Sequence, residues 1–158
     1  MTKDAKATVI SWLTVLIVLG VCIYIIMHIV ENHKLEAEKQ MANSIGDLGT
    51  IKVSVNGTTY DAKVESNTTA KEFLNILPIS LTMSDSDGNR KYSYMYSGLT
   101  TNSSKTKNFQ AGDIALSGTS TIVVFYKSTN SSGKFIKLGH IDDFPDLGSG
   151  SATISFTK

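Results

Sequence analysis

The stretch from Ala7 to Val30 constrains this chain more than any other feature. It reads ATVISWLTVLIVLGVCIYIIMHIV, and it has no charged residue between Lys6 and Glu31. As a helix with a rise of ~1.5 Å per residue, it would be about 35 Å long, enough to cross a hydrocarbon core of ~30 Å. A helix also satisfies every backbone N–H and C=O group inside lipid. The sequence therefore predicts a transmembrane anchor over residues 7–30, surrounded by membrane lipid.

The anchor is predicted to be an uncleaved signal anchor. A cleavable signal has an apolar core of only ~7–15 residues followed by small residues, whereas this run is longer and ends in His28-Ile29-Val30-Glu31. Lys3 and Lys6 precede it, and Lys34 and Lys39 follow it, so the positive charges are nearly balanced. The terminal amine favours a single-pass protein of the cell membrane with a cytoplasmic N-terminus and an extracytoplasmic C-terminal domain.

Composition limits what the remaining chain can be. The 158 residues have a formal net charge of +1 and include one cysteine, Cys22, inside the predicted anchor. A near-neutral chain without a basic cluster argues against nucleic-acid binding. A single cysteine permits neither an intrachain disulfide nor a cysteine-based metal site. We expect no cofactor and no metal, and a domain stabilised by its hydrophobic core.

Four parts follow from the residue pattern. Residues 1–6 form a short tail, 7–30 the anchor, 31–49 a helical stalk and linker, and 50–158 one domain. The stalk is rich in helix formers, and Gly46 and Gly49 indicate a flexible end.

The domain alternates apolar and polar residues in short runs, which is typical of β-strands with one buried face. Asn56-Gly57 is a strong hairpin signal between the first two runs. Residues 121–127, TIVVFYK, are apolar on both faces and predict a central strand covered on both sides. One helix is expected over residues 67–77, capped by Asn67 or Thr68 and stopped by Pro78. About eight strands and one capping helix predict a mainly β fold, a small closed barrel. The strands are expected at 51–55, 59–64, 79–84, 91–96, 112–118 (a short strand into a turn), 121–127, from Phe135 onward, and 152–157.

Four features are candidates for function. Tyr92, Tyr94 and Tyr96 share one face of a strand, where they form either core or a stacking platform, and Arg90 beside them could bind a carboxylate. The polar stretch 97–111 is a long loop and hence a candidate binding loop. A further polar stretch, residues 129–133, is expected to form only a turn. Two polar clusters could hold an ion or support acid–base chemistry, although turns explain both; they are Asp85/Asp87/Asn89 and His140/Asp142/Asp143/Asp146.

Several segments together resemble the bacterial cyclophilin-like domain family. They are IKVSVNG at 51–57, TAKEFLNILPISLTMSDSDGNRKYSY at 69–94, AGDIALSG at 111–118, TIVVFYKS at 121–128 and KLGHID at 137–142. The resemblance covers roughly residues 50–158 and implies a closed barrel of the cyclophilin type. Family members often have an aromatic residue at the position of Ser117 and an arginine at the position of His140.

The resemblance implies little about activity. Cyclophilins that isomerise X-Pro bonds use a strand arginine beside aromatic residues, a glutamine and a histidine; here Arg90 lies at an expected turn and the single Trp12 lies in the anchor. We therefore expect a membrane-anchored module that binds a protein, peptide or glycan partner without catalytic residues. A prolyl isomerase with a divergent site is the alternative. The expected ligand-facing residues are Arg90, Tyr92, Tyr94, Phe109, Tyr126 and His140.

Overall fold

A computed structural model describes the backbone of residues 3–158 and the side chains of 15–37, 39–40, 43–131 and 133–158. The chain divides into two compact units, residues 1–40 and 41–158. The predicted start of the anchor at Ala7, and Trp12 with it, lie outside the described side chains.

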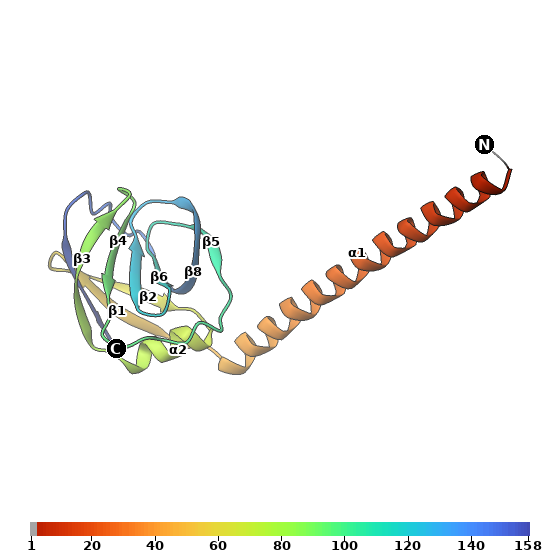
Figure 1. Cartoon of the computed structure of the whole chain (residues 1–158). Helices are drawn as coiled ribbons and strands as arrows, with labels where there is room; N and C mark the ends of the chain where they lie inside the picture. Colours follow the sequence, from red (N-terminus) through yellow and green to blue (C-terminus); the bar gives the residue numbers. More distant parts are fainter. Residues whose placement is uncertain (1–2) are drawn as a thin grey trace. The chain divides into compact units, whose positions relative to one another are not determined.

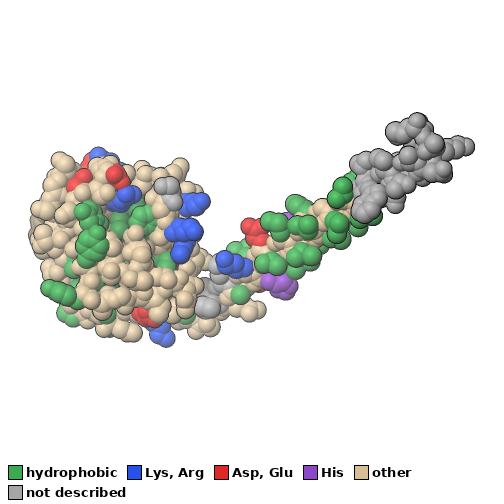
Figure 2. Space-filling view, viewed as in Figure 1, with side chains coloured by type: hydrophobic (Ala, Val, Ile, Leu, Met, Phe, Trp, Pro, Cys, Tyr) green, Lys and Arg blue, Asp and Glu red, His purple; other side chains and the backbone are tan. Residues whose placement is uncertain are grey.

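The first unit belongs to helix α1, Lys3–Ile45. Among the described residues it contains one segment long and apolar enough to cross a membrane, Val15–Ala37. Successive apolar side chains from Val15 to Val30 are exposed, and Figure 2 shows some of them as green atoms on the face that it draws. A helix surface that is apolar on all sides suits lipid. This finding suggests a single-pass anchor.

The second unit is a closed antiparallel β-barrel (Figure 1). Eight strands pair in the order β2-β1-β9-β3-β4-β7-β6-β8, and β8 pairs with β2 to close the ring. The predicted mainly β barrel is therefore confirmed. The strands are β1 Thr50–Val55, β2 Thr58–Val64, β3 Ile79–Ser86, β4 Arg90–Tyr94, β5 Thr106–Phe109, β6 Asp113–Ser117, β7 Thr121–Phe125, β8 Thr129–Ile141 and β9 Ala152–Thr157.

The closing seam between β2 and β8 is short and depends on a glycine. Only Ala62–Val64 of β2 pair with Gly139–Ile141 of β8. A Cβ atom on Gly139 would lie 2.7 Å from the carbonyl oxygen of Lys63. Glycine is therefore the residue that lets the two backbones approach closely enough to pair.

Helix α2, Thr68–Asn75, covers one end of the barrel (Figure 1). The side chain of Asn67 accepts a hydrogen bond from the Ala70 N–H at 2.8 Å and so caps the helix. Ala70 and Phe73 are buried on its inner face, and Phe73 packs edge-on against Phe156 of β9. The spacing-based prediction of one amphipathic capping helix is confirmed, with slightly tighter ends.

Two of the predicted loops are wrong in part. The stretch 97–111 contains β5, and residues 129–133 begin the long strand β8 rather than forming a turn. One edge of β8 pairs with β5 along its first half and with β2 near its end. Neither β5 nor the start of β8 shows a clear alternation of apolar and polar residues. The reason is that β5 covers a second apolar cluster, outside the barrel, with only one large side chain, Phe109.

Candidate functional site

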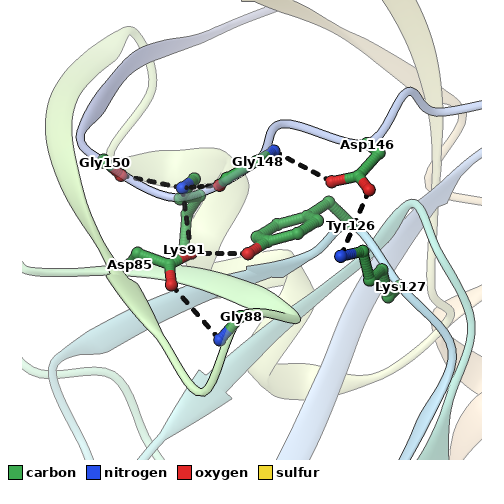
Figure 3. A network of polar contacts seen from close by, with 8 residues as sticks. All are labelled: Asp85, Gly88, Lys91, Tyr126, Lys127, Asp146, Gly148 and Gly150. Atoms are coloured by element: carbon green, nitrogen blue, oxygen red, sulfur yellow. Dashed lines mark hydrogen bonds and ion pairs between the residues drawn. The ribbon is translucent and has the colours of Figure 1, made fainter.

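A charged network lies inside the barrel wall near the β3–β4 turn (Figure 3). Lys91 of β4 is fully buried, and its Nζ pairs with Asp85 Oδ1 at 2.9 Å. The same Nζ donates to the carbonyl oxygens of Gly148 and Gly150, the latter at 2.7 Å. The Tyr126 hydroxyl donates to Asp85 Oδ1 at 2.6 Å. All three ammonium protons therefore have acceptors, and the network attaches the loop before β9 to the barrel.

The network shifts the protonation of two of its members. The hydrogen bond from Tyr126, followed by the contact with the Lys91 ammonium, lowers the pKa of Asp85 below its usual 3.8. Burial, followed by the hydrogen bond to Asp85, raises the pKa of Tyr126 to about 12. Both shifts preserve an ionised Asp85 and a neutral Tyr126 over the neutral pH range.

We expect Tyr126 to ionise only at strongly alkaline pH. Because the folded state holds its proton up to a pKa of about 12 against 10.0 ordinarily, its contribution to stability is complete below pH 10 and is lost as pH rises towards 12. The measurement is an alkaline titration of tyrosinate absorbance in the wild type and in Tyr126→Phe. The difference between the two curves should show one group titrating near 12, and a difference curve centred at 10 would contradict the network.

An aromatic cluster lies on the outer face of the barrel, beneath β5. Phe109 stacks on Phe125 with ring centroids 4.2 Å apart, and Phe135 packs edge-on against both rings. Tyr92 packs against this cluster. The Arg90 guanidinium lies 6.0 Å and 5.7 Å from the ring centroids of Phe125 and Phe135, within cation–π range. The double covering predicted for 121–127 is explained by this outer cluster and the inner core.

A buried carboxylate orients a histidine on the neighbouring strands. Asp113 of β6 is only 2% exposed, and its Oδ1 lies 2.7 Å from His140 Nδ1 and 2.8 Å from Lys137 Nζ. Its Oδ2 accepts from the Gln110 N–H at 2.8 Å. Because a carboxylate only accepts, Nδ1 of His140 carries the proton. The other ring nitrogen, Nε2, lies 3.4 Å from Asp142 Oδ1.

His140 also lines a groove of about 400 Å³ at the β2–β8 seam. The seam brings this groove together, since Lys63 of β2 pairs directly with His140 of β8. We call it the seam groove and define it by its lining residues: Lys63, Val64, Glu65, Ser66, His140 and Asp142. It contains bases and acids side by side, so it can bind groups of both charges.

The comparison with protein families identifies the fold. The sequence model of the Cyclophilin-like family matches residues 53–157, nearly the whole barrel. The chain belongs to the Cyclophilin-like family. The same comparisons found no matching curated protein and no matching solved structure.

The cyclophilin-like barrel separates the six residues predicted to face a ligand. Tyr126 lies in the inner core and Phe109 in the outer cluster, and both are buried. Arg90, Tyr92 and Tyr94 lie on β4, where Arg90 also pairs with Asp87. His140 lies three strands away, beyond β7 and β6, which is about 14 Å at ~4.8 Å per strand. The six therefore form no single surface, and ligand binding by the exposed ones stays a prediction.

The tyrosine face is neither core nor a continuous platform. Tyr92 is half-buried and contacts Tyr94 edge-on at 6.1 Å, but Tyr94 is 71% exposed and Tyr96 lies beyond the end of β4 and is fully exposed. The inward position of β4 is occupied by Lys91 instead. The core interpretation of all three tyrosines is therefore wrong for Tyr94 and Tyr96.

The polar loop before β5 is attached to α2. Thr100 donates from its backbone N–H and its hydroxyl to Glu72, at 2.8 Å and 2.9 Å. The buried Thr69 hydroxyl donates to the Thr100 carbonyl at 2.9 Å. These contacts attach the loop to α2, and they do not support its prediction as a ligand-binding loop.

Sequence reasoning missed Lys91 and Asp113, the two most buried charged residues. The inward position of each residue can be predicted only when the neighbouring strands are known, because its charged partner lies on another strand. Among the described residues, no group of three or more His, Cys, Asp or Glu side chains is placed to hold a metal ion. Asp85 turns inward to Lys91, while Asp87 and Asn89 form the turn between β3 and β4.

Proposed function

We propose that this chain is a membrane-anchored, extracytoplasmic cyclophilin-like module that binds a peptide segment of a partner protein in the seam groove. The observation that carries the proposal is the 2.7 Å contact between Asp113 and His140. A buried carboxylate holds one nitrogen of the ring and fixes its tautomer. A ligand can then reach the other nitrogen by displacing Asp142, whose fully solvated side chain lies 3.4 Å away. Such an arrangement pre-organises a polar contact and lowers the entropy cost of binding.

The lining of the groove favours a peptide over a glycan. Lys63 and His140 can meet acidic groups, Glu65 and Asp142 can meet basic ones, and the volume of about 400 Å³ suits a small ligand. Peptides present charged side chains and backbone N–H and C=O groups together. Sugars usually stack on aromatic faces, and among the described lining residues the only ring belongs to His140.

The anchor gives the proposal its location. The candidate span Val15–Ala37 would hold the barrel next to the bilayer. The lysines on the two sides of the span are nearly balanced, and the terminal amine favours a cytoplasmic N-terminus, which would place the barrel on the outer side. A partner is then a protein of the membrane or of the cell surface.

The test uses the full chain in lipid nanodiscs, screened against a random hexapeptide library. His140 is the only histidine after residue 33, so its imidazole signal in a ¹H–¹³C spectrum reports the groove directly. We expect enriched peptides to shift this signal and His140→Ala to weaken binding by about tenfold or more, as for the loss of a hydrogen bond to a charged group. Lys71 lines a different groove, which is formed in part by α2. Lys71→Ala is therefore the matched control and should leave binding unchanged.

Two outcomes would overturn the proposal. Binding that survives His140→Ala but is lost in Arg90→Ala/Tyr94→Ala would move the site to the outer face of β4. A protease-coupled Pro-peptide assay that runs faster than the uncatalysed rate, and slows in Arg90→Ala, would favour the isomerase alternative. We expect the uncatalysed rate, because Arg90 is held by Asp87 and two phenylalanine rings.

A further inference from the structure

Three exposed lysines lie where β5 pairs with the first half of β8. They are Lys105, Lys107 and Lys134, which we call the lysine patch. Thr106 pairs with Phe135, and the register shifts directly after this pair. Lys105 and Lys107 flank Thr106, and Lys134 precedes Phe135, so all three lie next to this pairing. In Figure 2, blue side chains lie together over the β5 side of the barrel, and no red atoms lie among them in that view.

Of the eleven lysines and arginines that the structure describes after residue 50, five form ion pairs, and the patch lysines are not among them. Lys52, Lys127 and Lys137 pair with Asp61, Asp146 and Asp113. Among the described residues, no ion pair involves a member of the lysine patch. Like charges that lie close together on one surface repel each other. An external anion would remove this repulsion.

The charge of the barrel is also unevenly distributed along β8. The lysine patch lies beside its first half, whereas Asp142, Asp143 and Asp146 follow its end. From Lys134 to Asp142 an extended strand runs about 25 Å at ~3.3 Å per residue. This exceeds the Debye length of ~8 Å at physiological salt, so an anionic surface near the patch would attract it without being repelled by the acidic end.

We propose that the lysine patch docks on anionic lipid headgroups of the membrane that α1 spans. The candidate span ends at Ala37 and the barrel begins at Thr50. Helical residues 38–45 add about 12 Å at ~1.5 Å each, and residues 46–49 add at most about 14 Å at ~3.5 Å each. The tether therefore keeps the barrel within reach of the surface, at a high effective lipid concentration.

The expected strength follows from the number of charges. Each lysine near an anionic surface increases membrane partition about fivefold, so three give about a hundredfold. A hundredfold partition would be weak binding for a free domain, but it is sufficient to determine the position of a tethered domain. This docking leaves the seam groove unaffected, because the patch shares no residue with it.

The test reconstitutes the full chain in nanodiscs of neutral phosphatidylcholine or of phosphatidylcholine with about a third phosphatidylglycerol. In a Cys22→Ser background, a fluorophore on Asn130→Cys reports energy transfer to a labelled headgroup. We expect high transfer in anionic discs that falls to the neutral-disc value at high salt. K105Q/K107Q/K134Q should abolish the difference between the discs, whereas K105R/K107R/K134R should retain it.

The matched control carries K52Q/K71Q/K158Q, which removes three exposed charges elsewhere on the barrel, and it should behave like the wild type. Equal transfer in both discs would overturn the proposal. So would an equal loss in the control variant, which would indicate a response to net charge alone. Binding of poly-glutamate to the patch in neutral discs, without a lipid effect, would assign the patch to an acidic protein instead.

Discussion

Replacing Gly112 by alanine is expected to destabilise the barrel by on the order of 4 kcal/mol. Gly112 has a φ of +92°, and a Cβ atom there would lie 1.9 Å from the carbonyl oxygen of Ile141. Its N–H donates to the Phe125 carbonyl at 2.7 Å, and its carbonyl accepts from the Ile141 N–H at 2.9 Å. A side chain would therefore add backbone strain of ~1–2 kcal/mol and overpacking of ~1–3 kcal/mol. Both would act where Gly112 is hydrogen-bonded to the ends of β7 and β8.

The measurement is thermal denaturation of residues 41–158, a compact unit with its own core. For a domain of this size the loss corresponds to a fall in Tm of on the order of 15 °C. Gly118→Ala is the matched control, because Gly118 also has a positive φ of +59° but no atom within 4 Å of its would-be Cβ. It should cost only the strain, ~1–2 kcal/mol. Equal losses in the two variants would show that the close approach at Gly112 is unimportant.

Asp85→Ala is expected to cost about 3–5 kcal/mol, as for the removal of one partner of a buried ion pair. The substitution leaves the Lys91 ammonium buried with two carbonyl acceptors and removes the acceptor of the Tyr126 hydroxyl. Lys91→Met should cost less, about 1–3 kcal/mol. It leaves two carbonyl groups without a donor and Asp85 without its cation, but the Asp85 carboxylate is partly exposed and keeps its hydrogen bond from Tyr126. Urea unfolding of both variants gives the two values.

The double variant tests whether the two residues act together. Asp85→Ala/Lys91→Met should cost clearly less than the sum of the single changes, because no buried charge remains. Exact additivity would contradict the network. The wild type should also lose the contribution of Asp85 at acid pH: its folded pKa is below the usual 3.8, so the contribution is complete above about pH 4 and decreases as pH falls further.

The sequence predicted the parts of the fold that depend on local pattern. Strand alternation at Ile51, Val53 and Val55 and the turn at Asn56-Gly57 gave the first hairpin. The spacing of Ala70 and Phe73 after Asn67 gave α2. The last strand, 152–157, was predicted with its bounds. In each case one face is buried, so the pattern of apolar residues carries the information.

The errors occur where the partner is distant in the chain. β5 and the start of β8 are polar segments that pair only because Phe109 and Phe135 share a cluster with Phe125. Lys91 occupies an inward position because Asp85 and two carbonyl groups meet it there. An apolar pattern cannot predict a buried cation, since its burial depends on acceptors from two other segments, β3 and the loop before β9.

The sequence by itself determined an apolar helix of membrane-spanning length and a small, mainly β barrel, because hydrophobic length and strand periodicity are local properties. Only the tertiary structure decided which polar residues meet. It brings Asp113 to His140 across 27 positions of the chain, places Lys63 beside them at the barrel seam, and divides the six predicted ligand-facing residues between two buried clusters and two surfaces. The physical reason is that an ion pair or a groove forms only between strands that lie side by side, and β2 lies beside β8 only in the closed barrel.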